Sequence, residues 1–219
     1  MNHQTTIQEY FAKRARCYKE AYGSEKSRGF LNRLYQLGWF PLRLIFKYTM
    51  DYLGKTNPQG VLDIGCGTGV YVAALAERGI AVTGLDSCNE MINVAENLLK
   101  ESGLNTSAKT VLADYLEWAE GIKDAYDLAL AIGVMDYVDD APVYLASFKR
   151  VAREVIVTFP TKSMFSFIAD FSYRQRGMRG YFYREEQIRV LLQAAGLEII
   201  HFTKIFPSTH WIHARRMML

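Results

Sequence analysis

The segment that most constrains the fold of this chain is Val61-Leu-Asp-Ile-Gly-Cys-Gly-Thr-Gly69. Its first four residues have the composition of a buried strand, and residues 70–78 have the pattern of a helix that stops at Gly79. Glycines between a strand and a helix carry no Cβ atoms, so the backbone can bend sharply and approach a ligand closely. The segment therefore predicts a strand, a tight turn and a helix, with a ligand bound at the turn.

The glycine spacing separates this turn from those that bind dinucleotides. The glycines follow the pattern G-x-G-x-G, which is one residue shorter than the G-x-G-x-x-G of dinucleotide-binding proteins. Asp63 stands two residues before the first glycine, where its carboxylate would repel a pyrophosphate and attract a cationic amino group. The turn therefore disfavours NAD and ATP as ligands.

After the glycine turn the chain alternates β-rich runs with helical stretches, which predicts βαβ units and a mostly parallel sheet. Further strands are expected at 80–85, 110–113, 128–132 and 155–159, and helices at 87–102, 140–153 and 184–195. Two last strands, at 198–206 and 210–217, flank a short turn and should form an antiparallel hairpin. Residues 7–53 have a helical pattern, with Pro41 expected to divide two helices.

Acidic side chains follow the second and third predicted strands. Asp86 ends the second strand, where a carboxylate can accept hydrogen bonds from ribose hydroxyls, and Asp114 follows the third, where it can accept one from an adenine amino group. Each also has a simpler interpretation, Asp86 as a helix N-cap and Asp114 as an ordinary residue at a strand end. Ser87 and Glu90 have the spacing of a capping box, and Asp140 is the expected N-cap of its helix.

The chain closely resembles the class I S-adenosylmethionine (SAM)-dependent methyltransferases in four ordered segments: the glycine turn, Val82-Thr-Gly-Leu-Asp86, Ala113-Asp114 and Asp127-Leu-Ala-Leu-Ala-Ile-Gly-Val-Met-Asp-Tyr-Val138. The resemblance covers residues 59–160 well and the two ends more loosely. It implies an α/β fold, a Rossmann-like three-layer α/β/α sandwich. Its seven-stranded, mostly parallel sheet would have the strand order 3-2-1-4-5-7-6, with strand 7 antiparallel. SAM would be the cofactor, bound at the carboxyl ends of strands 1, 2 and 4.

The resemblance also assigns cofactor-binding residues. Tyr10 and Tyr18 belong to a segment similar to one that closes over SAM in many small-molecule members, although simple core packing explains that segment as well. The complete set is Tyr10, Tyr18, Asp63, Gly65, Gly67, Asp86, Ser87, Met91, Ala113, Asp114, Tyr115, Ile132 and Gly133. Within this set the resemblance places Asp63 at the methionine part of SAM, Asp86 at the ribose and Asp114 at the adenine.

The catalytic residues are less clearly marked than the cofactor site. Methyl transfer depends mainly on approach geometry, and a general base adds ~10²–10⁴-fold where the nucleophile must lose a proton. The catalytic candidates are His210, Tyr137 and Asp136, with Tyr18 and His201 as further possible bases. The family often has Glu or His where Asp136 stands, so the motif does not single out one base. Metal-ligand spacing is absent from the sequence, and no metal is expected.

The charge of the chain is unevenly distributed. Residues 57–140 hold four basic and fourteen acidic residues, a net −10, whereas residues 1–56 carry a net +6 and residues 141–219 a net +7. The acidic middle is expected to face SAM, and the basic, aromatic flanks to build the acceptor site. We therefore divide the chain into an N-terminal helical cap, 1–56, and a SAM-binding core, 57–219. Within the core, 161–183 is expected to be a lid-like insertion.

These observations predict SAM-dependent methyl transfer to a small acceptor that is apolar or aromatic and can bear negative charge, with O-methylation favoured. An RNA or protein methyltransferase and a SAM-binding regulatory protein without turnover remain as alternatives. A nucleic-acid partner is not expected, because the chain shows no appended RNA-binding module. Three cysteines without pairing or metal spacing and a polar N-terminus predict a cytoplasmic protein. The basic and aromatic residues 28–53 would also suit contact with an anionic membrane surface.

Overall fold

The computed structural model describes residues 3–21, 30–122, 125–163, 166–205 and 209–217, which form eight helices and seven strands. The helices are α1 (His3–Ala21), α2 (Phe30–Thr56), α3 (Val70–Ala76), α4 (Asn89–Glu101), α5 (Tyr115–Glu120), α6 (Ala141–Val151), α7 (Ser166–Arg174) and α8 (Glu185–Ala194). The strands are β1 (Gly60–Ile64), β2 (Ala81–Asp86), β3 (Ala108–Leu112), β4 (Tyr126–Ala131), β5 (Ala152–Pro160), β6 (Leu197–Ile205) and β7 (Thr209–Arg216).

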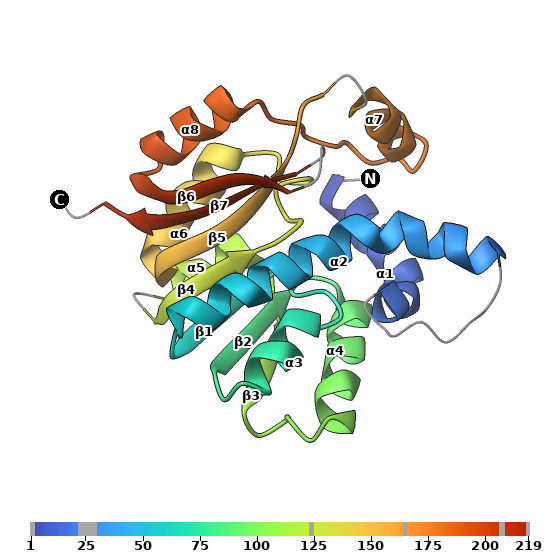
Figure 1. Cartoon of the computed structure of the whole chain (residues 1–219), viewed down its shortest axis with the longest axis horizontal. Helices are drawn as coiled ribbons and strands as arrows, with labels where there is room; N and C mark the ends of the chain where they lie inside the picture. Colours follow the sequence, from blue (N-terminus) through green and yellow to red (C-terminus); the bar gives the residue numbers. More distant parts are fainter. Residues whose placement is uncertain (1–2, 22–29, 123–124, 164–165, 206–208, 218–219) are drawn as a thin grey trace.

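The strands form one seven-stranded sheet in the order β3-β2-β1-β4-β5-β7-β6. Neighbouring strands from β3 to β5 are parallel, whereas β7 is antiparallel to both β5 and β6. Helices cover both faces of the sheet, which gives the three-layer sandwich visible in Figure 1. The predicted fold class, strand order and antiparallel seventh strand are therefore confirmed.

Each face of the sheet has its own hydrophobic core. On one face α5, α6 and α8 pack on the sheet around Leu145, Phe148 and Ile188, which are almost completely buried. On the other face α2, α3 and α4 pack around Leu53, Leu75 and the strand residues beneath them. The central strands are apolar because parallel strands between two helical layers are buried on both sides.

Three polar contacts hold the second half of α2 against the β6–β7 hairpin, across the sheet face seen in Figure 1. The Tyr48 hydroxyl lies 2.9 Å from Nε2 of His201, and the Trp211 indole N–H donates to Oγ1 of Thr49 at 2.9 Å. The Tyr52 hydroxyl lies 2.7 Å from Nδ1 of His213. α2 is thus fixed to the far edge of the sheet by side chains that follow one another on a single helical face. Among the described residues no helix is long and apolar enough to cross a membrane.

Two local predictions near helix ends were wrong. Pro41 does not divide two helices, because α2 runs through it from Phe30 to Thr56. Proline removes one backbone hydrogen bond of the helix. The free energy gained by burying Ile45 and Leu53, which lie in α2 after Pro41, offsets that loss. Ser87 does not cap the next helix, since Cys88 is the N-cap and makes no side-chain cap bond. The predicted cap at Asp140 is confirmed, because its side chain accepts from the Val143 N–H at 3.1 Å.

Other differences concern short elements. The helices α5 and α7 were not expected, α5 because it spans only six residues and α7 because its segment was interpreted as an irregular insertion. The turn of the last hairpin, residues 207–208, lies outside the described residues. The cap boundary at residue 56 follows the end of α2, although Met50 and Leu53 share a core with β1 and α3.

We predict that His213 makes folding pH-dependent. His213 is buried, and burial together with the charge of His201 lowers its pKa below the usual value, although hydrogen bonding to Glu154 opposes that shift. The unfolded chain therefore binds a proton at His213 that the folded chain does not. The contribution of His213 to the free energy of unfolding is fully present above the pKa of this group in the unfolded chain, about 6.5. It decreases as the pH falls below that value, by at most about 1.4 kcal/mol per pH unit.

The test compares the wild-type protein with His213→Gln in urea unfolding at pH 7.5, 6.5 and 5.5. We expect the free energy of unfolding of the wild-type protein to fall more steeply with acidification than that of the variant. Equal slopes for the two proteins would contradict the prediction.

Candidate functional site

A cavity of about 430 Å³ opens at the carboxyl ends of β1, β2 and β4. In a parallel α/β sheet this edge, where the strand order reverses, is the usual place for a ligand. Most of the residues predicted from the sequence line this one cavity. They are Asp63, Gly65, Gly67, Asp86, Ser87, Met91, Ala113, Asp114, Tyr115, Ile132, Gly133, Asp136 and Tyr137.

The glycine turn forms the floor of the cavity and is held to the end of β2. The N–H groups of Gly65 and Cys66 both donate to the Leu85 carbonyl, at 2.7 and 3.0 Å. Gly65 has a φ of +67°, and a Cβ there would come within 2.8 Å of Cγ2 of Val134. Glycine is therefore required at this position both by the backbone conformation and by space.

Asp63 brings a carboxylate to the inner end of the cavity. Its side chain is almost fully buried, and its Oδ2 atom has no hydrogen-bond partner among the described residues. Burial, with a smaller contribution from the charge of Asp86, raises the pKa of Asp63 to about 8. A buried carboxylate without a partner is costly, so this atom is suited to a ligand that brings a hydrogen-bond donor or a positive charge.

Asp86 and Ser87 border the cavity at the end of β2. The Asp86 carboxylate accepts from the N–H of Gly67 at 2.9 Å and from the N–H of Cys88 at 2.8 Å. It therefore ties the glycine turn to the start of α4. Burial raises the pKa of Asp86, while these backbone hydrogen bonds favour its charged form.

Asp114 lies at the end of the cavity that α1 covers. Its carboxylate caps α5, accepting from the N–H groups of Leu116 and Glu117 at 2.9 and 3.3 Å. It also accepts from Nε2 of Gln4 at 2.6 Å. A second contact of α1 lies nearby, where the Gln8 side chain donates to the Ser87 carbonyl at 3.2 Å. The N-terminal helix is thus fastened over the cavity at two residues that the sequence assigned to the cofactor.

The opposite wall of the cavity is aromatic and follows β4. Burial raises the pKa of Asp136 there to about 7. Tyr137 packs edge-on against Phe11 of α1, with ring centroids 5.3 Å apart, and against Tyr173 of α7, at 5.7 Å. This wall therefore brings together β4, the N-terminal helix and the insertion around Asp136, a carboxyl group whose pKa is close to neutral pH.

Four predicted residues are not among those that line the cavity. His201 lies in β6, where its Nε2 is 2.9 Å from the Tyr48 hydroxyl. Tyr10 lies one residue before Phe11 and faces two arginines instead. His210 is buried beside Phe202, with ring centroids 5.4 Å apart, and its Nδ1 has no partner among the described residues. Burial lowers the pKa of His210, and its side chain is not among those that line the cavity. The Tyr18 side chain lies outside the described residues.

The charges around the cavity differ from those expected for an anionic acceptor. Among the described residues that line it, four are aspartates and none is Lys, Arg or His. In the insertion, Arg174 pairs with Asp170 at 2.9 Å and Arg179 lies over the Tyr181 ring at 5.2 Å. The basic flanks are therefore not part of the described cavity wall, which suits uncharged or cationic groups.

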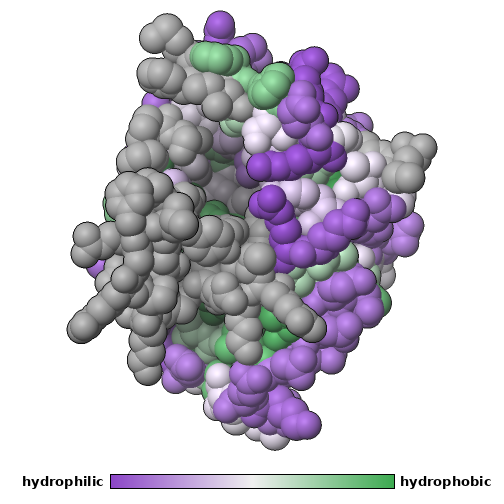
Figure 2. All heavy atoms as spheres, turned by 90° about the vertical axis from the view of Figure 1, so that its right-hand side faces the viewer, coloured by the Kyte–Doolittle hydropathy of each residue, from purple (hydrophilic) through white to green (hydrophobic). Residues whose placement is uncertain are grey.

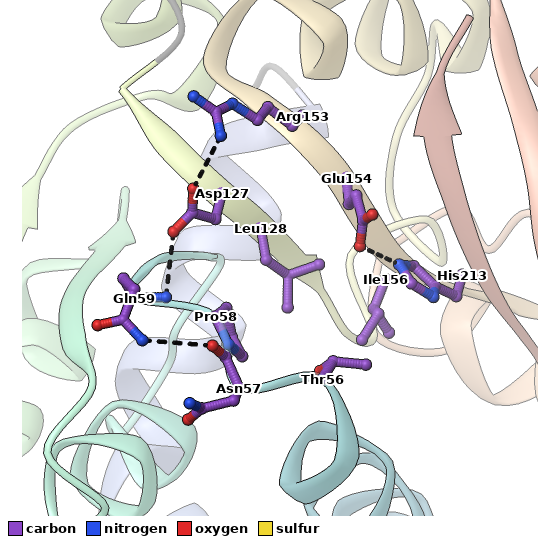
Figure 3. Close-up of a pocket in the computed structure, with 10 residues that line it drawn as sticks. All are labelled: Thr56, Asn57, Pro58, Gln59, Asp127, Leu128, Arg153, Glu154, Ile156 and His213. Atoms are coloured by element: carbon purple, nitrogen blue, oxygen red, sulfur yellow. Dashed lines mark hydrogen bonds and ion pairs between the residues drawn. The ribbon is translucent and has the colours of Figure 1, made fainter.

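A second cavity, of about 270 Å³, opens at the amino-terminal edge of the sheet (Figure 3). Its polar groups are already paired. Asp127 accepts from the N–H groups of Gln59 and Gly60, both at 3.1 Å, and Arg153 lies 3.6 Å from the same carboxylate. The Glu154 carboxylate lies 2.7 Å from Nε2 of His213. This edge therefore holds the chain entering β1 in place, and the first cavity is the candidate functional site.

Comparison with known proteins identifies the family of the chain. A family model described as a methyltransferase domain matches residues 40–202, well over half of the chain. The chain therefore belongs to the methyltransferase domain family. This result confirms the family predicted from the sequence, the class I SAM-dependent methyltransferases, whose cofactor is SAM.

Among the similar curated proteins are two enzymes of ubiquinone biosynthesis. The ubiquinone biosynthesis O-methyltransferase of Agrobacterium fabrum is 27% identical over 158 residues, which cover 67% of this chain and 62% of that protein. The corresponding enzyme of Nitrosomonas europaea is 27% identical over 181 residues, covering 81% and 71%. The chain thus spans less than two thirds of the first of these relatives.

One similar solved structure covers nearly the whole chain. The magnesium protoporphyrin IX methyltransferase of Synechocystis PCC 6803, with bound S-adenosylhomocysteine (SAH), has a TM-score of 0.74 and 20% sequence identity. The match covers 97% of this chain and 99% of that one. At this identity the likeness shows the fold, and here it extends to the N-terminal helices and the insertion.

Several lining residues were missed by the sequence analysis. Those from outside the recognised motifs include Gln4, Ile7, Gln8, Phe11, Leu42, Tyr144 and Tyr173. Gln4 and Gln8 lie at the i,i+4 spacing of a single helical face, which was the one available signal for them. Tyr173 had no signal, because only the folded insertion brings α7 next to Tyr137.

We predict that Gly180 keeps Tyr173 in the cavity wall. A Cβ at position 180 would overlap the Tyr173 ring, so Gly180→Ala must displace that ring or the backbone. We expect the substitution to lower the free energy of unfolding by ~1–3 kcal/mol, the usual cost of overpacking. Gly121→Ala is the matched control, because its nearest atom, the Trp118 carbonyl oxygen, is 3.8 Å from the added carbon. Urea unfolding measures both, and an equal effect of the two substitutions would refute the prediction.

Proposed function

We propose that this protein transfers a methyl group from SAM to a hydroxyl oxygen of a small apolar or aromatic acceptor. The observation that carries the proposal is the buried Asp63 carboxylate, whose Oδ2 has no described partner and lies beside the glycine turn in the large cavity. An amino group is the ligand group that this atom best accommodates. SAM, when bound, supplies an electrophilic methyl group on a sulfonium.

The acidic residues of the cavity would hold the cofactor by its polar groups. Asp63 would accept from its amino group, Asp86 from ribose hydroxyls through the lone pairs that Gly67 and Cys88 leave free, and Asp114 from the adenine amino group. Gln4 now donates to Asp114, so a ligand there would share or replace this donor. These roles rest on the placement of the carboxylates and on the family.

The remaining wall would bind the acceptor. Tyr137, Tyr173, Phe11 and Val134 give it an aromatic and apolar surface, and Asp136 contributes a carboxyl group to it. A carboxyl with a pKa of about 7 is suited to accept the proton of an attacking hydroxyl near neutral pH. The similar O-methyltransferases of ubiquinone biosynthesis and the magnesium protoporphyrin methyltransferase support a ring-bearing small molecule as the acceptor.

We further propose that the protein works in the cytoplasm, and that α2 from Phe40 onward touches an anionic membrane surface from which an apolar acceptor is drawn. The side chains of 28–39, the first part of the segment expected to make this contact, lie outside the described residues. Phe40, whose side chain is 48% exposed at the middle of α2, supports the contact. Flotation with phosphatidylglycerol vesicles tests it, and Phe40→Ser should reduce the bound fraction. Failure of the wild-type protein to float would refute the membrane contact without affecting methyl transfer.

We predict that Asp63→Asn loses SAM binding. The neutral amide removes the charge that would face the amino group, and we expect Kd to rise about 10- to 100-fold, the cost of removing one partner of a buried charged pair. Asp51→Asn is the matched control, since Asp51 lies on the surface of α2 in an ion pair with Lys47. Isothermal titration calorimetry measures both, and no SAM binding by the wild-type protein would overturn the proposed function.

The pKa of Asp63 adds a pH dependence to this measurement. In the free protein the carboxyl is protonated below about pH 8, and binding an amino group would lower its pKa and release the proton. Affinity for SAM should therefore rise as the pH increases from 6 toward 8. The Asp63→Asn variant should lack this part of the dependence, and an identical pH profile for both proteins would contradict the role given to Asp63.

We predict that Asp136→Asn slows turnover without weakening the binding of the cofactor. Loss of the base should lower kcat by ~10²–10⁴-fold, while the Kd for SAH stays near that of the wild-type protein. The acceptor is taken from a panel of substituted phenols screened for SAH release. Wild-type kcat should rise with pH through about 7, because the base must be deprotonated. Asp139→Asn, three residues away on the exposed surface, is the control. An unchanged kcat in Asp136→Asn would exclude Asp136 as the general base.

A further inference from the structure

Two arginines from distant parts of the chain share one tyrosine ring. The guanidinium carbon of Arg14, on α1, lies 4.9 Å from the centroid of Tyr10, and that of Arg176, just after α7, lies 5.4 Å from the same centroid. Both arginines are exposed, and neither forms an ion pair with any carboxylate of the described residues. Two positive charges are therefore gathered in one place, with no partner of opposite charge in the part of the chain that the structure describes.

The position of this cluster connects it with the candidate site. Tyr10 precedes Phe11, which lines the cavity, and their rings lie 5.3 Å apart. Arg176 lies three residues after Tyr173, another lining residue, and the backbone N–H of Arg176 donates to the Tyr173 carbonyl at 2.9 Å. Figure 2 looks onto this end of the molecule, where hydrophilic residues border a hollow beneath the α7 segment. The arginines thus stand outside the aromatic wall, on the side where α1 and the insertion meet.

Stacking on the tyrosine leaves the arginines able to bind an anion. A guanidinium that lies over an aromatic ring uses its face, and its N–H donors remain in the plane for a carboxylate or phosphate. Arg174, on the neighbouring turn, differs because its guanidinium is already paired with Asp170 at 2.9 Å. The Tyr10 ring therefore holds two forks of donors in place at a small loss of side-chain freedom.

We propose that Arg14 and Arg176 form an anion subsite that binds a carboxylate or phosphate at the outer end of the acceptor. The inference rests on the proposed function and deepens it. An anion is disfavoured inside the cavity, whose described lining has four aspartates and no basic residue. An acceptor with an anionic end would therefore enter with its hydroxyl first and leave its charge between the two arginines. Each arginine is then a specificity-determining residue that acts at a distance from the reacting atoms.

The test uses SAH-saturated full-length protein and a matched pair of probes. Isothermal titration calorimetry compares 6-hydroxy-2-naphthoate with the uncharged 6-methyl-2-naphthol, and 2-naphthyl phosphate distinguishes phosphate from carboxylate. We expect the wild-type protein to prefer an anionic probe. Arg14→Gln and Arg176→Gln should each lower the affinity for the anionic probe ~3- to 10-fold, the range for an exposed charge pair at a preformed site. Arg174→Gln, the control, should leave all three affinities within twofold.

Specific outcomes decide the proposal. Loss of naphthoate or phosphate affinity in the two variants, with naphthol and SAH binding unchanged, supports it. Equal weakening of naphthol would mean that the arginines only shape the cavity, and no preference of the wild-type protein for an anion, or no probe binding, would also overturn it. Failure of SAH to bind would instead refute the proposed function. The same comparison of probes on the cofactor-free protein then decides the anion subsite by the same criteria.

Discussion

The site depends on the attachment of one short turn to the end of the neighbouring strand. The Leu85 carbonyl accepts two N–H groups from the glycine turn, and the Asp86 carboxylate accepts a third from Gly67. Because β1 and β2 are parallel neighbours, these bonds join two strand ends that are twenty residues apart in the chain. They fix the bend that turns Asp63 inward and opens the cavity above it. Without this attachment the carboxylates would have no common orientation.

The sequence was most informative where a backbone requirement and a charge coincide. Gly65 must be glycine, and Asp63 and Asp86 stand at the ends of buried strands, so the central part of the cavity could be predicted from the residues. The order of the sheet came from the resemblance to the family. The remainder could not, because it depends on packing between distant segments. Gln4 reaches Asp114, and Tyr173 reaches Tyr137, only once α1 and α7 have folded onto the core. His210 was misplaced for the same reason, since its position in a strand did not reveal which way its ring would point.

The cavity contains two chemical environments that different parts of the chain supply. The methyltransferase core provides carboxylates at the strand ends, which suit a polar cofactor. The N-terminal helix and the insertion provide rings, which suit an apolar acceptor, and they bring Arg14 and Arg176 together outside it. In the proposed function, cofactor binding would depend on residues close in the sheet, whereas acceptor choice would depend on residues from the two ends of the chain. This division explains why the family was evident from the sequence while the acceptor was not.

The hydrogen bond from Gln4 to Asp114 has a consequence for exchange between the cavity and solvent. That carboxylate already accepts two backbone N–H groups of α5, so a further donor from a ligand competes with Gln4 for its remaining lone pairs. Whichever donor occupies them determines how firmly the first turn of α1 is held. A ligand that displaced Gln4 from this carboxylate would thereby loosen the first turn of α1, whereas one that shared the carboxylate with Gln4 would leave it in place.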